Sequence, residues 1–217
     1  MIVNLNLQGK NVLVIGGGTE ALKRICMLKD EQCTITAISK MVHPEIMKLA
    51  KNGEISHIRE DIKEMGFFTT YCPDIVITTT NNHKLNQEII KTAKEQKIMV
   101  YSSDNPESSD FANLGVIDIE GAVRIAISTG GKSPAMAKKL KEQIGKNVKK
   151  MVSVEDIYQI KIQNIARKLA QENITSQKDR KAFLTDVIND EIIKQLIKDK
   201  MIKKAESRVI TMLRNRD

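Results

Sequence analysis

The sequence predicts an α/β protein with three parts: a parallel sheet domain, a small α+β segment and an all-helical C-terminal region. Short β-branched runs alternate with amphipathic helical patterns over residues 11–102, which is typical of a doubly wound parallel sheet with right-handed crossovers. Two further strand-like runs flank the turn dipeptide Glu120-Gly121, which indicates a β-hairpin. From Ser153 onward the pattern is helical, without a strand or a glycine-rich turn. We therefore expect domain boundaries near residues 112 and 151.

The stretch NVLVIGGGTEALKRICML, residues 11–28, joins the first strand to the first helix. An apolar run meets three glycines, and an amphipathic helix begins near Thr19, so backbone N–H groups and the positive end of a helix dipole converge where a pyrophosphate fits. Gly16 permits the tight turn, Gly18 lets the backbone approach phosphates, and Ala21 is the small residue that completes the pattern G-x-G-x-x-A. The alternative is an ordinary strand–helix turn without a ligand. The residues expected to contact a dinucleotide here are Gly16, Gly17, Gly18, Thr19, Glu20 and Ala21.

The other elements of the sheet domain follow in alternation. Strands are expected at residues 33–39, 54–59, 74–80 and 98–102. Helices are expected at residues 44–51, with Pro44 in the first turn, and at residues 83–96, where Leu85, Ile89 and Ala93 share one face. A single helical turn is expected at residues 62–65. Since ligands of such sheets bind beyond the carboxyl ends of the strands, residues 16–18, 39–40 and 78–82 are the candidate ligand edge.

The end of the second strand departs from the dinucleotide-binding pattern. That pattern predicts an acidic residue that bonds the adenosine ribose, but Ser39 stands there, followed by Lys40. The Ser39 hydroxyl can bond a ribose hydroxyl, and Lys40 is compatible with a 2′-phosphate, so NAD is expected ahead of NADP. Further cofactor contacts are expected from Ser39, Lys40, Met41, Thr79, Thr80 and Asn81.

Beyond Asp104 the pattern changes from strand–helix alternation to a hairpin and helices. The hairpin strands are expected at residues 114–119 and 122–128. Ser133 as N-cap and Pro134 as first helical residue predict a helix to about residue 150. Three more helices are expected, at residues 154–171, 178–189 and 190–213.

Composition narrows the function classes. Residues 132–217 hold 21 of the 35 Lys and Arg residues but only 11 of the 27 Asp and Glu residues, so this half can attract a polyanion, although solvated helix faces are the common explanation. Tryptophan is absent and aromatic residues make up 3%, which argues against a platform for stacked bases. No apolar run approaches a membrane span, and no signal peptide is evident. Three cysteines without a C-x-x-C motif favour the cytoplasm, and the three scattered histidines predict no stable metal site.

Four segments carry a resemblance to a known family. They are NLNLQGKNVLVIGGGTEALKR, DIVITTTNNHKLNQEI, VYSSDNPESSDF and RIAISTGGKSPAMAKKLKEQI. In order and spacing they resemble the precorrin-2 dehydrogenase family, which includes single-domain enzymes and the N-terminal part of multifunctional sirohaem synthases. The run A-I-S-T-G-G-x-S-P is the most specific piece. The resemblance covers nearly the whole chain, and because no methyltransferase domain follows Asp217, the stand-alone form is expected.

The resemblance implies a fold, a reaction and an assembly. It implies a Rossmann domain at residues 1–112 that binds NAD, a dimerisation domain at 113–150 and a helical domain at 151–217. It implies the oxidation of precorrin-2 by NAD to sirohydrochlorin and NADH, and in some members the insertion of ferrous iron to give sirohaem. It also implies a homodimer with the active site between the nucleotide-binding and dimerisation parts.

The resemblance further assigns roles to single residues. Asp104 matches the family's general base, whereas the sequence alone favours a turn aspartate before Asn105-Pro106. Asn81 and Asn82 stand where the family has a polar pair facing the nicotinamide, and polar contact is expected of them. The residues expected to bind substrate carboxylates are Ser128, Gly130, Gly131, Lys132 and Ser133, with turn and helix capping as the alternative. Precorrin-2 bears eight carboxylates. The cations expected to steer it are Lys132, Lys138, Lys139, Lys141, Lys161 and Arg167.

Two readings from other classes stay open beside the dehydrogenase and the dehydrogenase–ferrochelatase. A regulatory NAD-sensing module shares the sheet core, but such modules carry an acidic residue after the second strand and lack the hairpin–helix element. A basic nucleic-acid binder accounts for the charge, but no binding motif supports it.

Overall fold

The structure is a computed structural model that describes residues 2–216 and divides into two compact units, 1–113 and 114–217. The first unit is a parallel five-stranded sheet with the order β3-β2-β1-β4-β5. Its strands are β1 (Asn11–Ile15), β2 (Thr34–Ile38), β3 (Ser56–Ile58), β4 (Ile75–Thr78) and β5 (Met99–Ser102). Its helices are α1 (Thr19–Leu28), α2 (Pro44–Lys51), α3 (Phe67–Tyr71) and α4 (His83–Glu95), and a 3₁₀ turn, η1 (Pro106–Ser108), follows β5.

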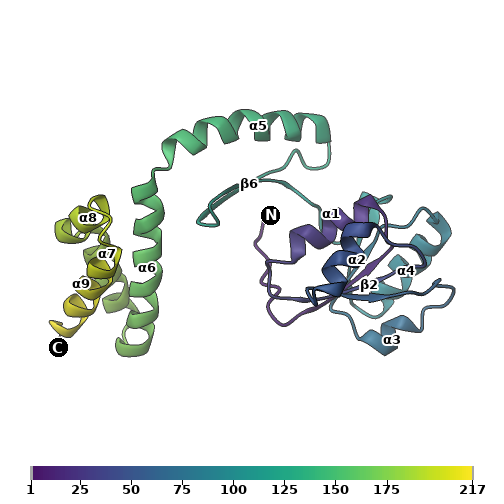
Figure 1. Cartoon of the computed structure of the whole chain (residues 1–217), viewed down its shortest axis with the longest axis horizontal. Coiled ribbons are helices and arrows are strands. Elements are labelled where there is room, and N and C mark those ends of the chain that lie inside the picture. Colours follow the sequence, from purple (N-terminus) through teal and green to yellow (C-terminus); the bar gives the residue numbers. More distant parts are fainter. Residues whose placement is uncertain (1, 217) are drawn as a thin grey trace. The chain divides into compact units, whose positions relative to one another are not determined.

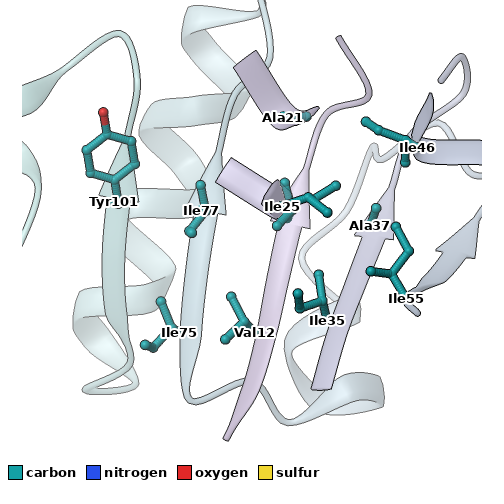
Figure 2. Packing of buried hydrophobic residues seen from close by; sticks show 11 residues of the cluster. Val12, Ala21, Ile25, Ile35, Ala37, Ile46, Ile55, Ile75, Ile77 and Tyr101 are labelled. Atoms are coloured by element: carbon teal, nitrogen blue, oxygen red, sulfur yellow. The ribbon is translucent and has the colours of Figure 1, made fainter. Parts of the chain in front are cut away.

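The sheet is covered on both faces because successive residues of each buried strand point to opposite sides. Val12 and Val14 of β1 face α1 and α2, where Ile25 of α1 and Ile46 of α2 complete one core layer (Figure 2). Leu13 and the other alternate residues face α3 and α4 and form the second layer. This two-sided burial matches the doubly wound α/β architecture that the alternation of elements predicted.

One short helix of this unit was not predicted, and one predicted turn is absent. Residues 62–65 form no helix, and α3 lies immediately after them instead. The rings of Phe67 and Phe68 stack with centroids 4.5 Å apart, and both side chains are buried beneath the sheet. Burial of this aromatic pair, rather than helix propensity, places the helical turn at Phe67.

The second unit begins with the predicted hairpin. Strands β6 (Gly115–Ile119) and β7 (Val123–Ile127) are antiparallel, and both turn residues, Glu120 and Gly121, have positive φ. Helix α5 (Pro134–Met151) follows, with the Ser133 hydroxyl accepting from the N–H of Met136 at 3.2 Å. None of the residues of α5 is buried.

Four helices complete the second unit: α6 (Val154–Asn173), α7 (Gln177–Asn189), α8 (Glu191–Lys198) and α9 (Ile202–Arg214) (Figure 1). Ile162, Ala166 and Ala170 form an i, i+4 stripe on α6 that packs on Phe183 of α7 and on residues of α8 and α9. The prediction of one helix over residues 190–213 was wrong. Lys200, with φ +58, ends α8, and the N–H of Met201 bonds back to the carbonyl of Leu196 at 2.8 Å. Across residues 2–216, no helix combines the length and apolar character required to cross a membrane.

Candidate functional site

The glycine-rich turn after β1 has three different local environments. Gly16 has φ +117, and a Cβ there would collide with the side chain of Thr79. A Cβ on Gly17 would collide with the carbonyl oxygen of Met41 and lie 2.5 Å from the Ser39 hydroxyl. Gly18 has no atom within 4 Å of the place where a Cβ would stand. The first two glycines are therefore required by packing, while Gly18 borders open space.

Among residues 2–216, no side chain caps the N-terminus of α1, which begins at that space. Gly18 is the N-cap and has no side chain with which to accept, so the N–H groups of the first helical turn gain no cap from it. Uncapped amides, the helix dipole and the open space at Gly18 fit the pyrophosphate of a dinucleotide.

Glu20 lies in this first turn, where its charge would oppose a phosphate, but it is paired within α1. It bonds to Arg24, and Lys23 is 3.2 Å away. Burial raises the pKa of Glu20, whereas the cations of Arg24 and Lys23 lower it by more, so the net pKa lies below the ordinary value. Arg24 also donates to the Tyr101 hydroxyl at 3.0 Å and lies over its ring. Arg24 thus joins α1 to β5, and Glu20 pairs with Arg24.

The loop after β2 folds against the glycine turn. The N–H of His43 donates to the carbonyl of Gly17 at 2.7 Å. Ser39 is buried, with its hydroxyl 3.2 Å from Nε2 of His57 on β3. Lys40 lies 3.4 Å from Asp61, and Met41 is 82% exposed. The cofactor contacts expected at Ser39, Lys40 and Met41 therefore lie together at the end of β2, and His57 of β3 joins them.

Residues after β4 serve mainly to fix the backbone. The Thr79 hydroxyl donates to the carbonyl of Ile15 at 3.0 Å, which ties the end of β4 to the glycine turn. The Asn82 side chain caps α4 by accepting from the N–H of Leu85 at 3.2 Å. Asn81 is exposed beside it. Of the two asparagines, Asn82 therefore has a structural role in the helix start.

Asp104 is held by three side chains from two neighbouring elements. Ser102 of β5 donates to Oδ1 at 2.5 Å. Asn86 and His83 of α4 bond to Oδ2, at 2.9 Å from Nδ2 and 2.6 Å from Nδ1. The Asp104 side chain is 20% exposed and the His83 side chain 76% exposed, so the pair reaches from a buried network to solvent.

The three donors decide the ionisation of Asp104. Burial raises the pKa of Asp104, but the hydrogen bonds from Ser102, Asn86 and His83 lower it by more, and the net pKa lies below the usual value for aspartate. The side chain is therefore a carboxylate at neutral pH, able to accept hydrogen bonds.

Asn86 is the buried centre of this network. Its Oδ1 accepts from Thr78 and, at 2.6 Å, from Thr80, and its Nδ2 donates to the Thr80 carbonyl and to Asp104, each at 2.9 Å. Every amide atom is satisfied, as a polar group in a core requires. Close by, the Ser103 hydroxyl is buried and has no partner among the described residues.

His83, Asn86 and Ser102 were not expected at this site from the sequence. The available signal was the spacing His83 to Asn86, an i, i+3 pair on the first turn of a helix that begins at the ligand edge of the sheet. Among residues 2–216, no group of three or more His, Cys, Asp or Glu side chains is arranged to hold a metal ion.

The turn before α5 bonds largely to itself. The Ser128 hydroxyl accepts from the N–H of Gly130 at 3.0 Å, and the Thr129 hydroxyl bonds to both N–H and carbonyl of Ser133 at 3.1 Å. Gly130 and Gly131 have φ of +61 and +77, values that favour glycine. Lys132 is exposed at the tip. The cations expected to steer the substrate, Lys138, Lys139, Lys141, Lys161 and Arg167, are exposed on α5 and α6.

Comparisons with known proteins give matches in both units of the chain. Residues 3–113 match a family described as putative NAD(P)-binding, and residues 121–147 match the central region of sirohaem biosynthesis proteins. A sirohaem synthase of Nitrosococcus oceani is 29% identical over 140 residues, which are 64% of this chain and 29% of that protein. One of Actinobacillus pleuropneumoniae serotype 7 is 24% identical over 97% of this chain and 42% of its own length. The chain thus spans well under half of these relatives.

A solved structure extends the likeness to nearly the whole chain. The precorrin-2 dehydrogenase SirC superposes with a TM-score of 0.67 at 25% sequence identity and covers 94% of this chain and 99% of its own. The glycine turn, the hairpin–helix element and these matches lead to one assignment. The chain belongs to the family described as putative NAD(P)-binding, and it is similar to sirohaem synthases and to the precorrin-2 dehydrogenase SirC.

Proposed function

We propose that this protein oxidises precorrin-2 to sirohydrochlorin with NAD as hydride acceptor, in the synthesis of sirohaem. The observation that carries the proposal is the ionised Asp104, held by three donors at the same sheet edge as the uncapped start of α1. Similarity to sirohaem synthases and to a precorrin-2 dehydrogenase supports the substrate class. The three free cysteines favour a reducing compartment, and we assign the cytoplasm.

The cofactor is NAD, which when bound accepts a hydride from the substrate. The amides of Thr19, Glu20 and Ala21 bind its pyrophosphate across the open side of Gly18. The buried Ser39 hydroxyl bonds a hydroxyl of the adenosine ribose. Ser39 rather than Lys40 is the ribose contact, since Lys40 is already paired with Asp61 at 3.4 Å.

Asp104 is the general base for the proton that leaves the substrate. Because its pKa is lowered, the carboxylate is ionised at neutral pH and does not retain the proton. His83, whose side chain is 76% exposed, bonds through Nδ1 to Oδ2 at 2.6 Å and so holds the carboxylate close to solvent, to which the proton can leave. His83 is a positioning residue in this scheme, and Asn86 fixes the carboxylate from below.

The substrate is an octacarboxylate, and the turn before α5 offers it donors. Residues 128–133 present two positive-φ glycines, the exposed Lys132 and the N-terminus of α5, a combination that binds carboxylates. The exposed lysines of α5 attract the same anion over longer range.

The experiment is anaerobic turnover of precorrin-2 by the purified protein with NAD, followed through the NADH and sirohydrochlorin spectra. Wild type and the control Asp30→Asn, an exposed aspartate after α1, are expected to turn over alike. Asp104→Asn is expected to lose roughly a hundredfold or more in kcat, the usual size of a general-base effect. Activity of Asp104→Asn within threefold of wild type would remove Asp104 from the chemistry.

Two further outcomes separate the alternatives. If the wild-type protein binds NAD but forms no NADH, the chain is a nucleotide-binding regulatory module. If ferrous iron added to the product yields sirohaem faster than in a protein-free control, iron is a second substrate and the enzyme is also a ferrochelatase.

A further inference from the structure

The helical part of the second unit contains a groove to which the proposed reaction assigns no role beyond the expected steering of the substrate by Arg167. It lies between α6 and α7, has a volume of about 770 Å³, and is open to solvent. Ala170, Leu184 and Ile188 supply its apolar floor, and Arg167, Lys178 and Lys181 supply its rim. We call these six residues the α6–α7 groove. Its volume is within the roughly 300–1,000 Å³ of small-molecule sites.

The cations of the groove are not neutralised by the protein. Arg167, Lys178 and Lys181 are exposed, and within the described part of the chain none of them forms a salt bridge. No aspartate or glutamate lines the groove. The surface charge is therefore left for a ligand to satisfy.

A further arginine makes one wall rigid. Arg180 donates from Nε to the carbonyl of Ile174 at 2.7 Å and from Nη2 to that of Thr175 at 2.8 Å. It thereby caps the carbonyl end of α6 and joins the last turn of α6 to the first turn of α7. Lys178, Lys181 and Ile188 follow a spacing of three and seven residues, so they lie along one side of α7.

This combination selects an amphipathic anion. An apolar body covers Ala170, Leu184 and Ile188, and several anionic groups at its periphery meet the three cations. A nucleic acid fits less well because no aromatic side chain lines the groove to stack a base. A flat apolar ring bearing peripheral carboxylates meets both requirements.

We propose that the α6–α7 groove is a second binding site for a polycarboxylated tetrapyrrole, formed by residues of the helical part alone. The identity of the ligand rests on the proposed function, whereas the preference for an apolar polycarboxylate rests on the groove itself. Such a site retains substrate or product on the protein and so assigns a binding role to the helical C-terminal part.

The test uses the full chain and uroporphyrin III, a stable octacarboxylated tetrapyrrole, at near-physiological salt. Hydrogen–deuterium exchange and a fluorescence titration are recorded for wild type and Lys178→Glu/Lys181→Glu. The matched control is Lys203→Glu/Lys204→Glu, which makes the same change in net charge on the exposed side of α9. Unchanged circular dichroism and thermal midpoints verify that both variants are folded.

Uroporphyrin is expected to slow exchange in wild-type peptides covering residues 164–188. The groove variant is expected to lose that protection and to bind one equivalent of uroporphyrin at least tenfold more weakly than wild type. The control variant is expected to bind uroporphyrin with an affinity within twofold of wild type. Ile188→Ser, which changes no charge, is expected to weaken binding several-fold.

Absence of protection at residues 164–188, or equal losses in both charge-reversed variants, would overturn the proposal. Protection by a short acidic peptide but not by uroporphyrin would overturn it too, in favour of a protein partner. Because exchange and fluorescence need neither NAD nor turnover, a failure of the dehydrogenase proposal is seen separately, in the NADH assay.

Discussion

Gly17 and Gly18 are neighbours in the turn after β1, but only one of them is confined by the protein. A methyl group on Gly17 points into the backbone of the loop after β2, at the carbonyl of Met41, which cannot swing aside as a flexible side chain would. A methyl group on Gly18 meets nothing within 4 Å, and the backbone there has φ −84, which any residue adopts. Gly17 is thus required for packing, whereas the adjacent Gly18 leaves space for a ligand.

This contrast gives a paired prediction. Gly17→Ala is expected to lower the free energy of unfolding by about 1–3 kcal/mol, because the loop must be displaced. Gly18→Ala is expected to stay within about 0.5 kcal/mol of wild type but to bind NAD more weakly, since the methyl group occupies the pyrophosphate space. Urea denaturation and NAD titration of both variants measure the two effects. Equal NAD affinity in Gly18→Ala and wild type would mean that no phosphate lies there.

Asp104 makes stability depend on pH in a definite direction. Its pKa is lowered in the folded state, so its stabilising contribution is complete above the unfolded pKa of about 3.9 and is lost as pH falls through the folded value. Asp104→Asn is therefore expected to cost about 1–3 kcal/mol at pH 7 and progressively less below about pH 4. Denaturation curves between pH 7 and 3 measure this gap in unfolding free energy between wild type and Asp104→Asn. A gap that widens in acid would contradict the assigned hydrogen bonds.

Among the elements, α8 and α9 depend on one aspartate. Asp190 caps α8 by accepting from the N–H of Ile193 at 2.8 Å and bonds to Arg208 of α9 at 2.9 Å. Burial raises the pKa of Asp190, but Arg208 and the N–H of Ile193 lower it by more, so the carboxylate is charged where it joins the two helices.

Asp190→Ala removes both the cap and the pairing with Arg208, and we expect it to destabilise the protein by about 1–3 kcal/mol. Asp190→Asn retains a capping oxygen and is expected to cost less than half as much. Thermal and urea unfolding of the two variants provide the comparison. Equal destabilisation would show that the cap contributes little and the charge contributes most.

The sequence predicted well those helices that begin at a capping residue or a proline. Pro44 and Ser133 mark two helix starts, and both helices begin where expected. The break between α8 and α9 carries no glycine or proline, and buried residues continue at near-helical spacing from Ile197 to Ala205, so periodicity predicted one helix. Lys200 takes the left-handed conformation in a local helix-ending turn, where glycine or asparagine is the usual residue, so the sequence carries no marker of the break.

The candidate site was predictable in part for a related reason. The carboxyl ends of parallel strands share an edge, which placed the glycine turn, Ser39 and Asp104 near a ligand. The partners of Asp104 lie 18 and 21 residues before it, on α4, and become its neighbours only because β4 pairs with β5. Such distant partners require the three-dimensional arrangement, so His83 and Asn86 had no predicted role.

At the scale of the whole molecule, the exposed helix α5 is the feature that concerns self-association of the chain. No residue of α5 is buried over its 18 residues, while Met136, Met151 and the adjacent Val154 are 45%, 78% and 53% exposed. We propose that a second copy of the chain covers this surface, as the family resemblance implies. The separate functions assigned to residues 1–112, 113–150 and 151–217 stay predictions.

Sedimentation analysis at micromolar concentration is expected to find a dimer of wild type. Met136→Glu/Met151→Glu is expected to shift the mass toward the monomer, because charges would enter an apolar interface. Ile192→Glu, at an exposed isoleucine on α8, is the control and is expected to remain dimeric. A monomeric wild type would exclude the proposed homodimer.

The central position of β1 also constrains how the first unit folds. β1 precedes both of its partners in the chain: it pairs with β2 on one side and with β4, at residues 75–78, on the other. During synthesis this strand therefore stays unpaired on one edge until β4 has left the ribosome, with Val12–Ile15 available for wrong contacts. Nascent chains that end before residue 75 therefore lack the partner of one β1 edge, and a ribosome pause before that point is expected to lower the yield of folded protein.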